Sequence, residues 1–140
     1  MQYNGLKSDF NSLSKFVFIY ETRIKRMNRE NEFIQFSSNA FYLFKHKLRT
    51  NIKFATISEI KNRPKQTKQT LFLTKKRNLI IDFCRHLRNS FSHGLLKKEN
   101  NNMIILDVYR KKYTSKGFLE YEAVMQFVIE VIKDFENIKH

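Results

Sequence analysis

Turn-forming residues are scarce in this chain, and that scarcity restricts its possible folds more than any other feature. The 140 residues include three glycines and one proline. A fold of many short strands needs many tight turns, which these two residues form most readily. Hydrophobic residues make up 41% of the chain, including 14 Phe and 6 Tyr, which is enough to build a core. The composition therefore predicts one mainly α-helical domain over residues 1–140.

Apolar residues recur at helical spacing in four segments of the chain. The spacing predicts helices over residues 6–27, 31–49, 79–93 and 121–138. Asn31 is a suitable cap for the second helix, because its side chain can accept a hydrogen bond from a free backbone N–H. Gly94 is expected to end the third helix, since glycine readily adopts the left-handed conformation that follows a helix.

The segments between the helices carry other patterns. Residues 52–60 are a short apolar segment, and residues 61–70 lack apolar side chains and include the single proline. The second segment is expected to be an exposed flexible loop, either a plain linker or a basic loop that holds a phosphate backbone. A turn at 100–102, a strand at 103–109 and a partner strand at 117–119 predict one small β-hairpin. The predicted fold is thus an all-α bundle of four or five helices, with this hairpin before the last helix.

Positive charge dominates the chain and is unevenly distributed. Lys and Arg number 27 against 13 Asp and Glu, which gives a formal net charge of +14. Between residues 45 and 77 there are eleven basic residues and one acid, whereas acids gather near the last helix. This polarity indicates a polyanionic partner, and an A+T-rich coding sequence that favours lysine is the alternative explanation. The residues expected to bind RNA are Lys61, Arg63, Lys65, Lys68, Lys75, Lys76, Arg77 and Arg85.

The sequence shows no pattern of a membrane span, a leader or a cofactor site. No stretch resembles a secretion signal, and no run of about 18 apolar residues could span a bilayer. A cytoplasmic protein with no membrane partner is therefore expected. The one cysteine, Cys84, lies in an apolar stretch and is expected to be buried and inert. Neither a glycine-rich phosphate loop nor a zinc-ligand spacing is present, so no cofactor and no metal are expected.

One short segment of the third predicted helix carries groups suited to phosphodiester chemistry. Asn89 and His93 share a helical face because they are four residues apart. Arg88 is rotated roughly 140° from His93, and its long side chain can reach over. A histidine moves protons near neutral pH, and an arginine holds phosphoryl oxygens as negative charge develops on them. An arginine followed five residues later by a histidine also arises by chance. A surface arginine and a helix-terminal histidine with no function therefore remain the alternative.

The segment from Arg88 to Gly94, Arg-Asn-Ser-Phe-Ser-His-Gly, resembles the motif of the HEPN superfamily. Members of this superfamily are small α-helical bundles with an Arg-x4-6-His motif near the end of a helix. The resemblance is specific over the motif and coarse elsewhere, where a late helix carries the motif and one long helix follows. It implies a metal-independent endoribonuclease, often the toxin of a toxin–antitoxin or phage-defence system, with an active site formed across a homodimer.

By this resemblance, Arg88 and His93 are the catalytic pair, and Asn89 orients or supports them. RNA is the implied substrate, and an antitoxin protein is the partner that a toxin would need. One subgroup has a tyrosine two residues after the histidine, where a nucleotidyltransferase antitoxin acts, but this chain has Leu95 there. The rival interpretation is a non-catalytic HEPN-like or unrelated basic module that binds RNA, a nucleotide or a protein.

Overall fold

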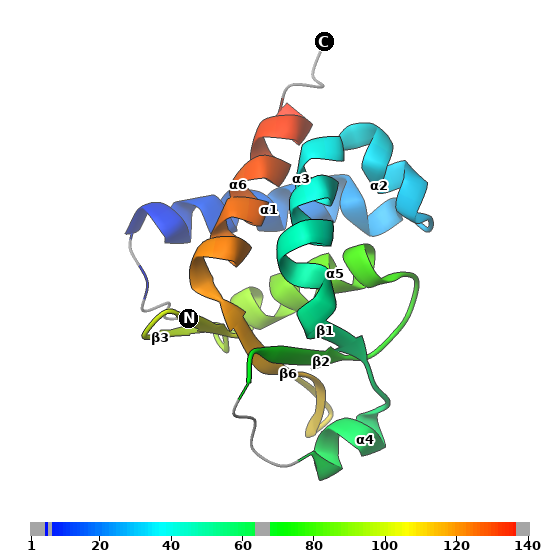
Figure 1. The fold of residues 1–140 in the computed structure, drawn as a ribbon, viewed down its shortest axis with the longest axis vertical. Helices are drawn as coiled ribbons and strands as arrows, with labels where there is room; N and C mark the ends of the chain where they lie inside the picture. The colour runs from blue at the N-terminus through cyan, green and yellow to red at the C-terminus, as the bar shows by residue number, and fades with distance from the viewer. Residues whose placement is uncertain (1–4, 6, 64–67, 137–140) are drawn as a thin grey trace.

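In the computed structural model, which describes residues 5, 7–63 and 68–136, most of the helices lie on one face of a six-stranded sheet and one short helix packs on the other (Figure 1). The chain is therefore an α/β protein, and the predicted all-α bundle with one small hairpin is wrong. The strands are β1 Ile52–Phe54, β2 Thr70–Leu73, β3 Lys97–Glu99, β4 Asn102–Ile104, β5 Asp107–Tyr109 and β6 Lys112–Glu120. Three of them, β1, β2 and β3, lie where the sequence analysis predicted no strand.

Strand β6 is the centre of the sheet. The strand order is β1-β2-β6-β4-β3, and β5 pairs with β6 beyond the end of β4. Strands β1 and β2 run parallel, whereas the other pairs are antiparallel. The strand predicted over 103–109 is thus divided into β4 and β5, and both pair with the longer strand that replaces the predicted 117–119. The predicted hairpin is one part of a larger sheet.

Gly117 allows β2 to lie close against β6. A Cβ atom at this position would lie 2.1 Å from the Thr70 carbonyl oxygen and 2.8 Å from the Leu71 Cα atom. The backbone of Gly117 also has a φ of +146°, which side chains rarely allow. Only glycine therefore fits at this point of the central strand.

The tight turns of the sheet are formed without glycine. Asn100, between β3 and β4, has a φ of 55°, and Arg110 and Lys111, between β5 and β6, have φ values of 51° and 67°. Positive φ at both central residues matches the twist of a two-residue hairpin. Asparagine tolerates this conformation, whereas for arginine and lysine it costs of the order of 1 kcal/mol each. The low glycine count therefore did not reveal these turns, and this is why the composition misled the fold prediction.

The helices are α1 Lys7–Thr22, α2 Glu30–Phe36, α3 Ser38–Leu43, α4 Ile57–Asn62, α5 Leu79–Ser92 and α6 Tyr121–Glu136, with short turns η1 Ile24–Arg26, η2 Phe44–Leu48 and η3 Arg49–Asn51. The first, third and last predicted helices are confirmed over the described residues, although α1 ends at Thr22. The segment predicted as one helix over 31–49 is helical, but it is not one helix, because it breaks at Ser37 into α2 and α3 and continues as the π-helical η2. Asn31 does not cap it, since α2 begins at Glu30.

The loop predicted over 61–70 is shorter than expected. Helix α4 includes its first two residues and β2 begins at its last residue, and residues 64–67 lie outside the described residues.

The break between α2 and α3 lies at Ser37, which is fully buried. Its hydroxyl donates a hydrogen bond to Oδ2 of Asp134 in α6 at 2.8 Å, and the Ala40 N–H donates to the same oxygen at 3.3 Å. The carboxylate from α6 therefore caps α3, as an N-terminal acid often does. Buried residues continue at helical spacing on both sides of the break, which is why periodicity alone predicted one helix.

A single aromatic cluster fixes α5 against α6. The rings of Phe83 in α5 and Phe127 in α6 lie 5.5 Å apart, and Phe44 contacts both at 5.6 Å and 5.8 Å. Cys84 is fully buried beside Phe83, as predicted, and burial raises the pKa of its thiol well above the usual value. These contacts hold α5 between the other helices and the sheet, where it carries the predicted motif.

Candidate active site

The two ends of helix α5 are well defined. At its start, the Asn78 side-chain oxygen accepts a hydrogen bond from the Ile81 backbone N–H at 3.1 Å. At its end, Gly94 has a φ of 73°, and the Ser90 carbonyl accepts bonds from the two backbone N–H groups that follow Gly94. His93 therefore lies at the carboxyl end of the helix, where the helix carbonyls favour positive charge.

His93 contacts a carboxylate that the sequence analysis did not select. Its Nδ1 atom lies 2.7 Å from Oδ1 of Asp107 in β5. Asp107 is only 3% exposed, and its other oxygen accepts a hydrogen bond from the Thr114 hydroxyl at 3.1 Å. The pairing register of β5 with β6 shifts between Asp107 and Val108, and such an irregularity changes the direction of side chains along a strand. The one sequence signal for this site was an acid inside the otherwise apolar run over 103–108.

The contact with Asp107 orients His93 for proton transfer. Because Nδ1 donates to the carboxylate, the ring direction is fixed and Nε2 keeps its lone pair. The side chain of His93 is 48% exposed, so Nε2 can meet a ligand. The buried Asp107 carboxylate also keeps the ring in the orientation that exposes Nε2. The pair can thus act as a general base and, once protonated, as a general acid.

Arg88 and His93 do not touch within one chain. Arg88 turns toward α1, where its Nη2 lies 2.6 Å from Oε1 of Glu21, and its Nη1 donates to Oδ1 of Asn89 at 2.9 Å. Its Nε atom is buried and lacks a partner among the described residues. Over the same residues, no hydrogen bond or ion pair joins Arg88 to His93. Asn89 therefore supports the arginine, and Glu21 is a second acid that the sequence analysis did not select.

Arg85, which was expected to bind RNA, points into the protein. Its Nη2 donates to the Thr74 carbonyl at 3.1 Å and lies 3.4 Å from Oδ1 of Asp82. Asp82 is fully buried, and its Oδ2 accepts the backbone N–H groups of Lys76 and Arg77 at 2.8 Å and 2.9 Å. Arg85 thus balances a buried carboxylate, and Asp82 fixes the loop that leads from β2 into α5.

His86 connects α5, through a series of hydrogen bonds, to the residues that hold Asp107. It is fully buried, and burial lowers its pKa to about 4, so the ring is neutral near pH 7. Because a carbonyl oxygen can only accept, Nε2 is the protonated nitrogen of the ring and donates a hydrogen bond to the Thr74 carbonyl, 3.0 Å away. The backbone N–H of Thr74 donates to the Thr114 carbonyl at 3.0 Å, and the Thr114 hydroxyl holds Asp107. His86 has a structural role in this network.

A basic hollow lies between α4 and the turn that joins β5 to β6. Lys61 lines this hollow of about 710 Å³ together with Arg110, Lys111 and Lys112, and the last three were not selected from the sequence. Tyr109 is 61% exposed at the same turn. Exposed cations and aromatic rings together suit the phosphates and bases of a nucleic acid.

Two other predicted RNA-binding residues lie over aromatic rings of the sheet. Arg63 lies 4.4 Å from the centre of the Phe72 ring, and Lys75 lies 5.5 Å from that of Phe54. Lys68 is exposed, whereas Lys65 lies outside the described residues.

No protein-family model, curated protein or solved structure matches the chain. Within residues 5, 7–63 and 68–136, no three His, Cys, Asp or Glu side chains are grouped so that they could hold a metal ion. None of the helices in these ranges is long and apolar enough to cross a membrane.

Replacing His86 with glutamine should reduce the loss of stability below neutral pH. The pKa of His86 falls from about 6.5 in the unfolded chain to about 4 in the fold. Between these values the unfolded state binds the extra proton, so the free energy of unfolding decreases as pH falls, by roughly 3 kcal/mol over the whole window. Glutamine keeps an N–H donor for the Thr74 carbonyl and does not titrate.

Urea unfolding of the wild type and of His86→Gln between pH 7 and pH 4.5 tests this expectation. His46→Gln is the matched control, because His46 is exposed on η2. The wild type and the control should lose stability in parallel, and His86→Gln should lose distinctly less. Equal slopes for all three proteins would show that His86 does not carry this pH dependence.

Proposed function

We propose that the protein is a metal-independent endoribonuclease that cleaves single-stranded RNA with the RNA's own 2′-hydroxyl as nucleophile. The observation that carries this proposal is the 2.7 Å contact between His93 Nδ1 and the buried Asp107 carboxylate. It provides an oriented and half-exposed imidazole at the end of α5, as proton transfer requires. The formal net charge of +14 suits a polyanionic substrate.

The reaction needs a base, an acid and a cation at the phosphate. Nε2 of His93 accepts the proton of the 2′-hydroxyl while the 2′-oxygen attacks the adjacent phosphorus. The bond from the 2′-oxygen to phosphorus forms, the bond from phosphorus to the 5′-oxygen breaks, and the 5′-oxygen leaves with a proton. The products are a 2′,3′-cyclic phosphate and a 5′-hydroxyl end. DNA is spared because it lacks the attacking hydroxyl.

Arg88 is the proposed cation at the phosphate. A guanidinium presents its N–H groups in a planar fork that matches two phosphoryl oxygens. Its ion pair with Glu21 is partly exposed, with the two side chains 27% and 32% accessible. A phosphate can therefore reach the guanidinium and displace the Glu21 carboxylate from it.

A homodimer is part of this proposal, because one chain offers one His93 for two proton transfers. We propose that the ends of two α5 helices meet across a two-fold axis, the commonest symmetry of protein dimers. One His93 then takes the proton from the 2′-hydroxyl, and the other donates a proton to the leaving 5′-oxygen. The same arrangement places Arg88 of one protomer near His93 of its partner, which one chain alone does not achieve.

The resemblance to the HEPN superfamily supports the same activity. Arg88, Asn89 and His93 keep the spacing of that motif at the end of a late helix, and the long helix α6 follows. The six-stranded sheet departs from the small helical bundles of that superfamily. From this resemblance we propose a toxin or phage-defence effector that acts in the cytoplasm and is restrained by an antitoxin protein.

The protein should cleave single-stranded RNA in the presence of EDTA and leave DNA of the same sequence intact. Products are read by gel electrophoresis and mass spectrometry of the RNA ends. His93→Ala and Asp107→Asn should each lower the cleavage rate by about 100-fold or more, since general base catalysis contributes at least that much. His46→Ala is the control and should retain full activity. Activity that needs a divalent metal, or that survives His93→Ala undiminished, would contradict the proposal.

The protein should be a dimer in solution at micromolar concentration. Light scattering should give twice the 17.0 kDa mass of one chain. Two copies of Arg88 and His93 repel one another, so an anion that binds between them should strengthen the dimer. Inorganic phosphate is therefore expected to shift dissociation to lower protein concentration, and sodium chloride of equal ionic strength is the control. A strict monomer, or a dimer structure with the two His93 side chains on opposite outer faces, would remove the shared site.

A non-catalytic RNA-binding module is the second candidate function. The observation that favours it is the 2.6 Å ion pair of Arg88 with Glu21, which occupies the cation that cleavage needs. In such a module, Glu21 would keep Arg88 from the phosphate at all times. Removal of the Glu21 charge should tighten RNA binding in both cases, and only the ribonuclease should also cleave the RNA.

Replacing Glu21 with glutamine separates the two candidates. In a ribonuclease, the loss of the competing carboxylate frees Arg88, so KM for RNA should fall about two- to fivefold with kcat kept. In a binding module, affinity rises and no cleavage occurs. Glu30→Gln is the matched control, because Glu30 on α2 pairs with Arg49 at 3.9 Å and not with Arg88. Unchanged KM in Glu21→Gln would show that Arg88 does not contact the phosphate.

A further inference from the structure

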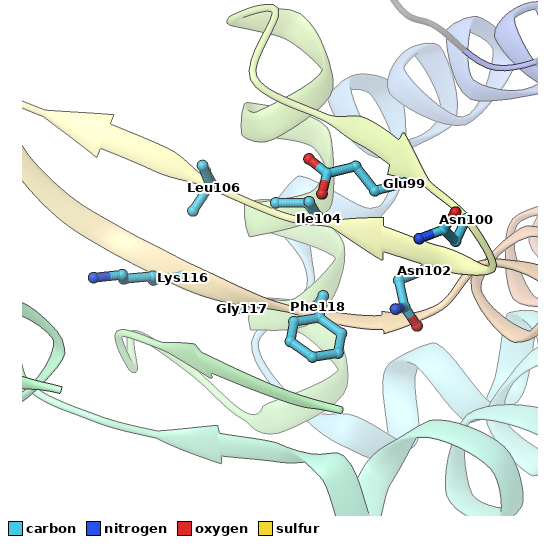
Figure 2. A pocket seen from close by; sticks show the side chains of 8 residues that line it. All are labelled: Glu99, Asn100, Asn102, Ile104, Leu106, Lys116, Gly117 and Phe118. Atoms are coloured by element: carbon cyan, nitrogen blue, oxygen red, sulfur yellow. The ribbon is translucent and has the colours of Figure 1, made fainter. Parts of the chain in front are cut away.

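The face of the sheet that looks away from α5 and α6 is only partly covered. Helix α4 covers β2, where Ala55 and Ile60 pack on Phe72. Over β3, β4 and β6 the same face carries a hollow of about 380 Å³ (Figure 2). This volume lies within the range of small-molecule and nucleotide sites. The hollow plays no part in the chemistry assigned to His93.

The floor of the hollow is flat and apolar. Ile104 and Leu106 line it from the strand that leads to β5, and Phe118 lines it from β6. All three side chains are partly exposed, whereas Ile105 and Leu119 on the other side of the same strands are buried in the core. A partly exposed phenyl ring in a sheet offers a surface on which a planar group can stack.

The rim of the hollow is polar and its charge is divided. The Glu99 side chain reaches over Ile104 in Figure 2, and Glu99 has no ion-pair partner among the residues that the structure describes. Asn102 accepts a hydrogen bond from Gln69 Nε2 at 3.2 Å through its Oδ1, so its amide N–H groups remain for a ligand. One end of the hollow therefore offers a carboxylate acceptor next to an amide donor.

Positive charge lies at the other end of the hollow. Lys116 lines the hollow and extends away from Phe118 in Figure 2, and its Nζ lies 5.3 Å from the centre of the Tyr113 ring. Tyr113 also lines the basic hollow around Lys111 and Lys112. The contact between Lys116 and Tyr113 thus links the two hollows along β6, and cations line the way from the apolar floor to the β5–β6 turn.

We infer that this hollow binds one nucleobase of single-stranded RNA, with guanine preferred, and that the strand continues along β6 over Lys116 to the β5–β6 turn. The inference rests on RNA as the ligand in the proposed function, but not on cleavage. The base stacks on Phe118. Guanine offers two N–H groups that a carboxylate accepts together and an O6 that an amide donates to, which matches Glu99 and Asn102. Phosphates follow the cations, away from Glu99.

The hollow lies next to the candidate active site through the chain itself. Leu106 lines its floor, and the next residue is Asp107, which holds His93. Successive side chains of extended backbone point to opposite faces, so a base held over Leu106 lies on the opposite face from the Asp107 side chain, one residue away. A bound base would therefore fix which phosphodiester of the strand lies closest to His93.

Binding to a cleavage-deficient protein tests the hollow without cleavage. In the His93→Ala background, fluorescence anisotropy would measure binding of a labelled RNA of six uridines in which one uridine is replaced by guanosine, adenosine or cytidine. Guanosine should bind about tenfold more tightly than adenosine, as a bidentate contact to a base provides. Glu99→Gln should remove this preference, and Glu122→Gln, on exposed α6 surface, should keep it.

Two further variants test the stacking floor and the phosphate path. Phe118→Leu keeps an apolar side chain but not the ring, so affinity for all three RNAs should fall about fivefold or more. Lys116→Gln should flatten the slope of log affinity against log salt by about 0.7, the value for one phosphate contact of a single strand, and exposed Lys133→Gln should not. Thermal unfolding identifies any variant that does not fold. If Phe118→Leu does not fold, the loss of guanosine preference in Glu99→Gln, a change at an exposed residue, is the test of the base site.

The outcomes separate this inference from the proposed function. If His93→Ala binds with the guanosine preference and the wild type cleaves nothing, the ribonuclease proposal fails and the base site stands. If the wild type cleaves RNA while Glu99→Gln and Phe118→Leu leave affinity and base preference unchanged, the base site is wrong and the ribonuclease stands. Equal binding of all three RNAs by the His93→Ala protein would also overturn the base site.

Discussion

The pairing of β6 with β2 is the constraint on which the rest of the structure depends. Gly117 makes it possible, because any Cβ atom there would lie 2.1 Å from the Thr70 carbonyl oxygen. The same pairing continues to Thr74, whose N–H donates to the Thr114 carbonyl. Thr114 in turn holds Asp107, and Asp107 orients His93. The candidate site is therefore only as well ordered as the central strand of the sheet.

Helix α5 presents polar side chains to the sheet where an apolar face would be usual. Asp82, His86 and Ser90 are fully buried. Asp82 and His86 are hydrogen-bonded to the loop before α5, and the Ser90 hydroxyl oxygen accepts a hydrogen bond from the Leu106 N–H at 3.2 Å. Burying such groups costs free energy unless every contact forms, so they tolerate one alignment of helix and sheet. That alignment places the end of α5 beside β5. Apolar packing alone would define this position of the helix less well.

The sequence predicted the helix that carries the motif and the residues Arg88, Asn89 and His93, because helical periodicity and a short motif are local properties. The acids that contact them were not predictable, since Glu21 and Asp107 come from α1 and β5 and meet α5 only in the fold. The sheet was missed for a related reason. Its strands are mostly three or four residues long, too short for a visible alternation, and Arg110 and Lys111 form a turn that usually contains glycine.

The order in which the chain is synthesised gives the β2–β6 pairing a further consequence. Thr70 lies opposite Phe118, so every helix before α5 and the first two strands are made long before the strand that completes their sheet. Pairing of such distant segments is slow relative to local hairpin formation. His93 also leaves the ribosome ahead of Asp107 and Thr114, and its ring is unoriented until both have followed. The candidate site is therefore incomplete until β5 and β6 have been synthesised and have joined the sheet.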